Sequence, residues 1–244
     1  TLLRALADAG RTPATSEGRV LTVLSAHGGA GGSVFAAALA LRSGDALLVD
    51  LDPFGGGIDR MLGIRGPGPR WADIAVAHGG LDFPSLRQVL PRVGGVSVLA
   101  SGPEAPGSAA VEAVLDAGRR GGTTVVCDAV RTPGPSDIAV AGADLAVLCA
   151  QATLRGAAAG AVTAGQLRRA NPNAGLVVRG PAPGGLRAAD IAGEVGLPLL
   201  GAMRPQPQLA EQLERGGLQL AGRSPLARGA DRVLRTLARA VASG

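Results

Sequence analysis

The sequence predicts an α/β protein with a doubly wound, mainly parallel sheet, because strand-like runs alternate with helical stretches and a glycine loop follows the first run. Seven short aliphatic runs are separated by Ala- and Leu-rich stretches. Most runs lack apolar and polar alternation, which indicates strands buried on both faces of a sheet. The expected strands are Val20–Ser25, Ala46–Asp50, Val96–Ala100, Thr123–Asp128, Leu145–Cys149, Gly175–Val178 and Leu199–Met203.

The composition is that of one domain with an aliphatic core. The chain has 244 residues, 46% of them hydrophobic, with three Phe, one Trp and no Tyr. We therefore expect Ala, Val, Leu and Ile to pack helices closely on the sheet. The longest uninterrupted apolar run, Val34 to Leu41, is far shorter than the roughly 20 residues that cross a bilayer.

Charge and cysteine content bear on compartment and partners. All 24 basic residues are Arg, and the formal net charge is +5. Without a dense basic run or stacking aromatics, this charge permits nonspecific DNA binding but does not favour it. Cys127 and Cys149 lie in apolar runs, which indicates buried, reduced thiols and a cytoplasmic protein.

The N-terminal segment is expected to be a tether. Leu2 to Ala9 reads as a short helix, and a polar linker runs from Arg11 to Arg19. The chain begins at Thr1 without an initiator Met. We expect residues 1–18 to join a missing upstream domain, and residues 19–244 to form one domain.

The glycine loop carries the strongest functional signal. A predicted strand ends in Ala26-His27-Gly28-Gly29-Ala30-Gly31-Gly32-Ser33, and a helix-forming stretch follows at once. Glycines let the backbone adopt positive φ angles, and loop amides at a helix start can surround phosphate oxygens. A plain tight turn is the alternative.

This stretch resembles the phosphate-binding loop of MinD/ParA-type P-loop ATPases, whose motif is Lys-Gly-Gly-x-Gly-Lys-Thr/Ser between a strand and a helix. The matches are Gly28, Gly29, Gly31 and Ser33, while His27 and Gly32 stand at the two lysine positions. The resemblance implies a P-loop NTPase fold from about Arg19 onward. It also implies that nucleotide would contact Gly28, Gly29, Ala30, Gly31, Gly32, Ser33 and Val34.

Three aspartates extend the resemblance. Asp50 and Asp52 fall in a segment similar to the family's first switch, and Asp128 ends a strand where the family has its Walker B carboxylate. The resemblance implies that Ser33, Asp50 and Asp128 would hold Mg²⁺ if nucleotide binds, and that Asp52 and Asp128 are vestigial catalytic residues. For each Asp the alternative is a strand-end residue that caps the following turn.

A narrower likeness points to CpaE/TadZ-like proteins, including the actinobacterial septum-site-determining branch. It is carried by Arg70-Trp71-Ala72-Asp73, by Leu90 to Val96 and by Arg131. This likeness implies a receiver-like upstream domain and a role in septum site determination or in assembly of a Tad pilus or secretion system. We expect partner surfaces at Trp71 to Pro91, at the Arg131 loop and at the basic face of a C-terminal helix.

The lost lysines determine the expected mechanism. Removing one preorganised charge or donor costs about 3–4 kcal/mol of transition-state stabilisation, so ATPase activity is expected to be lost. No cofactor is then required, and ATP or ADP with Mg²⁺ would bind weakly at most. His27 is shorter than the lysine that would reach a facing nucleotide, so a homodimer would be independent of ATP. His27 or Arg131 could still contact phosphate or a partner. The alternative is an active ATPase with a substitute cation.

The C-terminal stretch predicts an amphipathic basic helix. One side of this helix carries aliphatic residues, and the other carries arginines. The aliphatic residues are Leu226, Val233, Leu234, Leu237 and Val241, and the arginines are Arg228, Arg232, Arg235 and Arg239. Such a helix usually covers the sheet, and its alternative is peripheral membrane contact at a pole or septum. We expect the partners of this chain to be proteins, and DNA is a less favoured partner.

Overall fold

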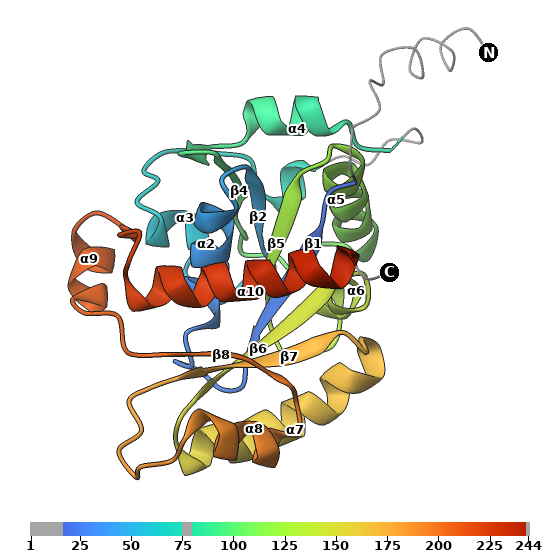
Figure 1. The fold of residues 1–244 in the computed structure, drawn as a ribbon. Coiled ribbons are helices and arrows are strands. Elements are labelled where there is room, and N and C mark those ends of the chain that lie inside the picture. Colours follow the sequence, from blue (N-terminus) through green and yellow to red (C-terminus); the bar gives the residue numbers. More distant parts are fainter. Residues whose placement is uncertain (1–16, 75–79, 243–244) are drawn as a thin grey trace, which may run out of the picture.

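The computed structural model describes residues 17–74 and 80–242. The expected helix Leu2 to Ala9 and nearly all of the expected tether lie outside the described residues. In the described residues, helices cover a central sheet (Figure 1).

The described chain forms one eight-stranded sheet in the order β3-β4-β2-β5-β1-β6-β7-β8. All seven strands expected from the sequence are present, and every neighbouring pair is parallel except β3 and β4. The doubly wound, mainly parallel sheet is therefore confirmed. The strands are β1 (Val20–Ser25), β2 (Ala46–Asp50), β3 (Arg92–Val93), β4 (Val96–Leu99), β5 (Thr124–Ala129), β6 (Leu145–Gln151), β7 (Ala174–Arg179) and β8 (Leu199–Met203).

The short edge strand β3 was not expected. It pairs antiparallel with β4, and Gly94 and Gly95 form the two-residue connection between Val93 and Val96. Gly94 has φ 58°, and a Cβ at Gly95 would lie 1.7 Å from the Gly44 carbonyl oxygen. A glycine pair between two valines is a hairpin signal, so this strand could have been predicted from the sequence.

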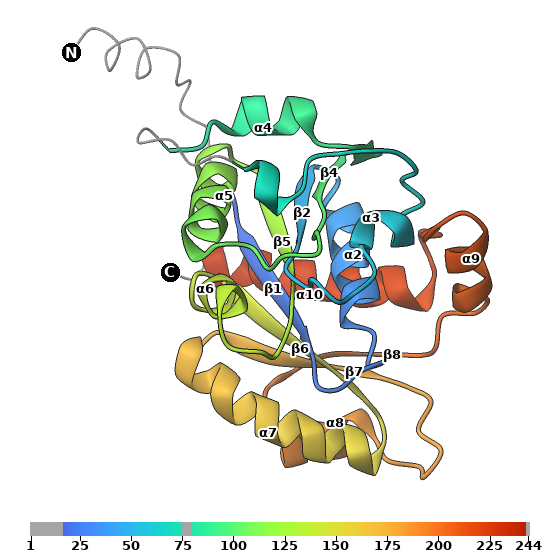
Figure 2. The ribbon, with the colours of Figure 1, turned by 180° about the vertical axis from the view of Figure 1, so that it is seen from behind.

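Helices cover both faces of the sheet (Figures 1 and 2). One face carries α2 (Gly32–Ser43) and α10 (Pro225–Ala242), and the other carries α5 (Ser108–Arg120), α6 (Pro135–Ala141), α7 (Leu154–Ala170) and α8 (Ala188–Val195). Shorter elements lie at the margins. They are α3 (Ile58–Met61), the 3₁₀ turn Trp71–Asp73, α4 (Phe83–Val89) and α9 (Leu209–Arg215).

Successive residues of the central strand β1 enter opposite cores. Leu21 and Val23 pack with α2 and α10, whereas Val20 and Leu24 pack with α5, α6 and α7. Because side chains alternate along a strand, a strand covered on both sides must be apolar throughout. This explains why the sequence runs lacked polar alternation.

The C-terminal helix α10 uses its apolar side within the fold. Leu226, Val233 and Leu237 are buried in the core shared with α2, whereas Arg232 and Arg235 are exposed. None of the helices formed by residues 17–74 and 80–242 combines the length and hydropathy needed to span a bilayer. Membrane contact through the arginine side of α10 stays a prediction.

Trp71 does not form a partner surface, contrary to the expectation for the segment that it begins. Its side chain is 4% exposed, and its Nε1 donates to the backbone oxygen of Asp50 at 2.6 Å. The indole instead belongs to the core beneath the sheet edge. The sequence does not show this contact, because it joins residues 21 positions apart.

We expect Trp71→Ala to lower the free energy of unfolding by about 3–5 kcal/mol, since it leaves a cavity and an unpaired carbonyl. Urea unfolding measures the change. Val89→Ala is the matched control, because Val89 lies on α4 with 59% of its surface exposed, and it should stay within about 0.5 kcal/mol of the parent. Equal stabilities of the two variants would contradict the buried role of Trp71.

Candidate functional site

The carboxyl ends of three neighbouring strands bring the predicted site residues together. In the sheet, β1 lies beside β5, and β5 lies beside β2. Asp128 of β5 is in register with Val23 of β1 on one side and with Asp50 of β2 on the other. The glycine loop leaves β1 at this same edge, so parallel pairing alone gathers the loop and both aspartates.

The loop between β1 and α2 has the backbone that its glycines predict. Gly29 has φ 78° and Gly31 has φ 94°, which are left-handed conformations that side chains disfavour. The amide of Phe35 donates to the Gly31 carbonyl at 3.0 Å, so α2 follows the loop directly. Strand, glycine loop and helix therefore occur at the expected positions.

The space beside Gly32 is occupied by Ser25, the last residue of β1. The Gly32 amide donates to Ser25 Oγ at 3.0 Å, and a Cβ at this position would lie 2.4 Å from that same oxygen. The amide is thus already hydrogen-bonded within the chain. The position that carries a lysine in the MinD/ParA motif here accepts a side chain only if Ser25 moves.

Two side chains from neighbouring strands hold the loop from outside. Arg179 Nη2 and Gln151 Nε2 both donate to the Gly29 carbonyl, at 2.6 and 3.1 Å. The Arg179 guanidinium also lies 3.4 Å from where a Cβ on Gly31 would be. Arg179 is therefore the cation beside the loop, a role that sequence reasoning did not assign. Its position at the end of the strand two places from β1 is the signal that could have found it.

Asp50 acts on the loop that follows it. Its carboxylate accepts the amide of Asp52 through Oδ1 and the amide of Ile58 through Oδ2, both at 3.0 Å. Burial raises the pKa of the Asp50 carboxyl, and these amides oppose the rise. Asp52 in turn accepts the amide of Phe54 at 2.9 Å. Both aspartates thus cap turns.

Asp128 is the most perturbed carboxyl of the site. It is 6% exposed, and burial raises its pKa to about 8, with the charges of Asp50 and Asp52 adding to the rise and a hydrogen bond from Ser33 opposing it. Its carboxyl therefore holds a proton over much of the neutral range in the absence of a cation.

Ser33, Asp50 and Asp128 are the predicted oxygen ligands for Mg²⁺ at this edge. Ser33 is close enough to Asp128 to lower the pKa of its carboxyl, but both Asp50 oxygens already accept amides. Among residues 17–74 and 80–242, no three His, Cys, Asp or Glu side chains are arranged to hold a metal ion. The residues present fit Mg²⁺ poorly, and the assignment of Ser33, Asp50 and Asp128 as its ligands stays a prediction.

His27 and Arg131 lie differently from one another. His27 is half-buried at the loop, with Nδ1 2.8 Å from the Gly28 carbonyl oxygen and with a buried Nε2 that has no hydrogen-bond partner in residues 17–74 and 80–242. Arg131 is exposed after β5 and lines a small hollow with Asp137 and Gln166, between α6 and α7. His27 is thus placed at the loop, whereas Arg131 faces the helices beside it.

Two curated relatives decide the family. They are Uncharacterized protein MT3760 and Uncharacterized protein Rv3660c, from two strains of Mycobacterium tuberculosis, and each is 51% identical over 246 residues. The match covers 98% of this chain and 70% of each relative. The chain belongs to their family. No protein-family model matches this member of the Rv3660c family.

Solved structures show which fold the Rv3660c family member has. A ParA family ATPase from Chlorobium tepidum superposes with a TM-score of 0.75 at 19% identity, covering 88% of this chain and 98% of that one. The cell division ATPase MinD of Pyrococcus furiosus gives 0.72 at 17% identity, covering 93% and 99%. The fold is therefore that of MinD and ParA P-loop ATPases.

The raised pKa of Asp128 predicts a pH-dependent stability. The folded protein keeps a proton on this carboxyl up to about pH 8, while the unfolded chain releases it near pH 4. Stability tied to this proton is complete below about pH 4 and is lost as the pH rises to about 8. We expect Asp128→Asn to remove this loss. Between pH 5 and pH 9, the free energy of unfolding of the variant should therefore fall by roughly 3–6 kcal/mol less than that of the parent.

Urea unfolding of the parent and of Asp128→Asn at both pH values makes the measurement. Asp116→Asn is the control, because Asp116 lies on α5 with 66% of its side chain exposed, and it should not change the difference between the two pH values. A parallel pH dependence of the parent and Asp128→Asn would contradict the assignment.

Proposed function

We propose that this chain is a positioning or scaffolding protein of the CpaE/TadZ group, in which the nucleotide site of a MinD/ParA fold binds nucleotide weakly or not at all. The observation that carries the proposal is the contact between Ser25 and Gly32. It takes up one loop amide and the space of the missing lysine side chain.

The remaining contacts of the loop support this reading. Ser25, Gln151 and Arg179 satisfy groups of the loop from within the chain. Phosphoryl transfer depends on cations that neutralise the transferred phosphate, and neither His27 nor Gly32 supplies the lysine charge. A loop that is held by its own neighbours keeps its shape without ligand, which suits a protein that presents surfaces.

Structures of the same fold supply the functional context. One is a MinC:MinD cell division protein complex from Aquifex aeolicus, and another is a putative plasmid partition protein from Borrelia burgdorferi bound to AMPPNP. By analogy, this chain would act through protein partners. We propose that it positions septum machinery or a Tad pilus or secretion system, as a cytoplasmic protein that reaches the membrane at a pole or septum.

The domain organisation belongs to the same proposal. Residues 19–244 would be one module, joined through residues 1–18 to a receiver-like domain. The mycobacterial relatives are longer than the match, since this chain covers 70% of each, so they have room for a further domain. Any homodimer would form without ATP, because His27 stands where a lysine would reach a facing nucleotide.

A second candidate function is favoured by one observation. Arg179 places a guanidinium beside Gly31, 3.4 Å from the Cβ position of that glycine. Such a cation could neutralise a phosphate in place of the lost lysines, which would make the chain an ATPase with a substitute cation. In that case Arg179→Gln should abolish Mg²⁺-dependent turnover.

Nucleotide titration separates the two functions. We expect the parent to hydrolyse ATP no faster than a buffer blank, and we expect the double variant Ser25→Ala/Gly32→Lys to bind a fluorescent ATP analogue about tenfold or more tightly. The gain follows because the variant restores a charge-assisted phosphate contact worth about 1.5–3 kcal/mol and removes the oxygen that blocks position 32.

Ser25→Ala/Gly32→Ala is the matched control, since it makes the same room without the charge. Gly32→Lys alone should gain less, because Ser25 Oγ lies 2.4 Å from the new Cβ. Robust Mg²⁺-dependent turnover by the parent, abolished in Arg179→Gln, would replace the scaffold by the ATPase.

Partner surfaces are tested in cells. We expect Ser33→Ala to leave the position of the septal or pilus machinery unchanged, because the proposed function does not use nucleotide. Reversing the exposed Arg232 and Arg235 to Glu should displace it, since α10 presents both arginines outward. Fluorescence microscopy of tagged machinery gives the readout, with circular dichroism confirming that both variants fold. Displacement by Ser33→Ala together with a silent arginine variant would overturn the scaffold reading.

A further inference from the structure

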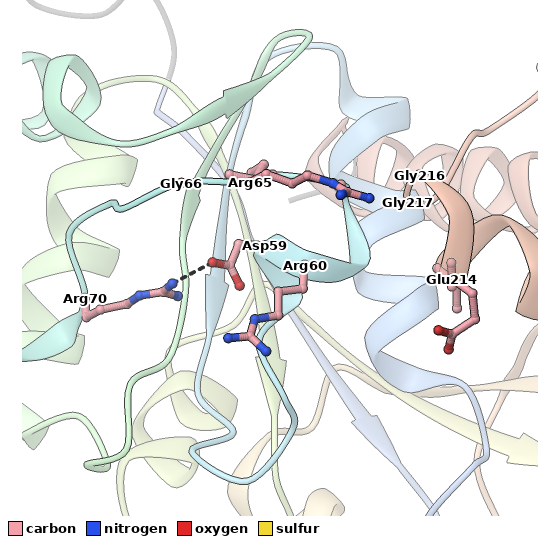
Figure 3. A pocket seen from close by; sticks show the side chains of 11 residues that line it. Asp59, Arg60, Arg65, Gly66, Arg70, Glu214, Gly216 and Gly217 are labelled. Atoms are coloured by element: carbon pink, nitrogen blue, oxygen red, sulfur yellow. Dashed lines mark hydrogen bonds and ion pairs between the residues drawn. The ribbon is translucent and has the colours of Figure 1, made fainter.

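A pocket outside the glycine loop lies between α3 and α9. Its cavity volume is about 390 Å³, and Figure 3 shows its lining. The walls come from α3 and the turn after it, from Arg70 ahead of the 3₁₀ turn, and from the end of α9 with the glycines that follow. Cavities of this size hold small molecules in many proteins.

The pocket has a rigid side built by backbone contact. A Cβ on Gly63 would lie 2.3 Å from the Gly216 carbonyl oxygen, and one on Gly217 would lie 2.3 Å from the Gly63 amide nitrogen. Both glycines have positive φ, 75° and 89°. The Leu218 amide donates to the Met61 carbonyl at 2.7 Å across the same junction. The two segments therefore interlock, and the pocket is preformed.

Two arginines of the pocket are unused. Arg60 and Arg65 are exposed, and their side chains make no hydrogen bond or ion pair with any residue in 17–74 or 80–242, whereas the Arg70 side chain bonds Asp59 at 2.7 Å and the Ser101 carbonyl at 3.2 Å. In Figure 3, Arg60 projects from α3 and Arg65 extends toward Gly217, with Glu214 across from them. Arginine is the side chain best suited to hold phosphate oxygens.

Asp59 supplies a second, independent signal. Its side chain is 6% exposed. Oδ2 bonds Arg70, but Oδ1 is buried and has no hydrogen-bond partner among the described residues. A buried carboxylate oxygen without a donor is costly, and such groups are normally satisfied. A ligand that brings a donor beside its anion would satisfy Asp59 and the two free arginines together.

We propose that this pocket binds a small phosphorylated molecule that also carries an N–H donor. Arg60 and Arg65 hold the phosphate, and Asp59 Oδ1 accepts the donor. Glu214, the other carboxylate of the lining, repels ligands with a second anion on the α9 side and so favours a single phosphate. The site is separate from the glycine loop and does not depend on the proposed function.

Glucosamine 6-phosphate and glucose 6-phosphate form a matched pair of probes, since they differ by an amine in place of one hydroxyl. The protonated amine makes a charge-assisted hydrogen bond to a carboxylate, which a hydroxyl donor does not. Isothermal titration calorimetry of the whole chain should show saturable binding of glucosamine 6-phosphate, about fivefold or more tighter than glucose 6-phosphate. Inorganic phosphate alone should bind more weakly than either. Ser33→Ala, which alters the glycine loop, should leave both affinities unchanged, which distinguishes this site from the loop.

Variants assign the contacts. Arg60→Gln/Arg65→Gln should weaken both sugar phosphates about tenfold or more. Arg92→Gln/Arg223→Gln removes two exposed arginines elsewhere and should leave both affinities unchanged. Asp59→Asn should abolish the preference for the amine. Because this change also breaks the pair with Arg70, its melting curve is recorded, and the arginine variants test the site even where Asp59→Asn does not fold.

Three results would overturn the proposal. They are the absence of saturable binding by either sugar phosphate, equal affinity for the two, and binding that the Arg60/Arg65 variant leaves unchanged.

Discussion

The parallel pairing of β1, β5 and β2 is the constraint on which the site depends. Parallel strands end at one edge, so the glycine loop, Asp50 and Asp128 meet there without any contact among their side chains having to draw them together. The pairing holds because both faces are buried, and a one-residue slip would turn each strand's side chains to the opposite core. The aliphatic core and the geometry of the site therefore have one cause.

At that edge, several polar groups of the loops are hydrogen-bonded to other groups of the same chain. The Gly32 amide goes to Ser25, the Gly29 carbonyl accepts from Arg179 and Gln151, and the Asp50 carboxylate accepts two amides of the next loop. In a working phosphate site, loop amides such as that of Gly32 donate to the phosphate oxygens of the ligand. Here the loop backbone is held by contacts within the chain, so it keeps the shape of a phosphate-binding loop although both lysine charges are missing.

Features that depend on pattern were predictable from the sequence, and features that depend on a partner distant along the chain were not. Buried strands and the loop conformation at Gly31 follow from local composition. The contact of Arg179 with Gly29 spans 150 residues, and the bond from Trp71 to Asp50 spans 21. Ser25 gave no signal, because a serine at a strand end is ordinary. The pocket at Gly63 and Gly217 likewise needs two distant segments.

Asp50 also closes a frame around residues 50–71. Its carboxylate bonds Ile58, the first residue of α3, and its carbonyl bonds Trp71, while Asp59 and Arg70, one residue inward from each of these, bond each other. The frame has one end at the sheet edge and the other at the pocket between α3 and α9. Three bonds, made by Ile58, Trp71 and Arg70, therefore join the two sites within one segment of the chain.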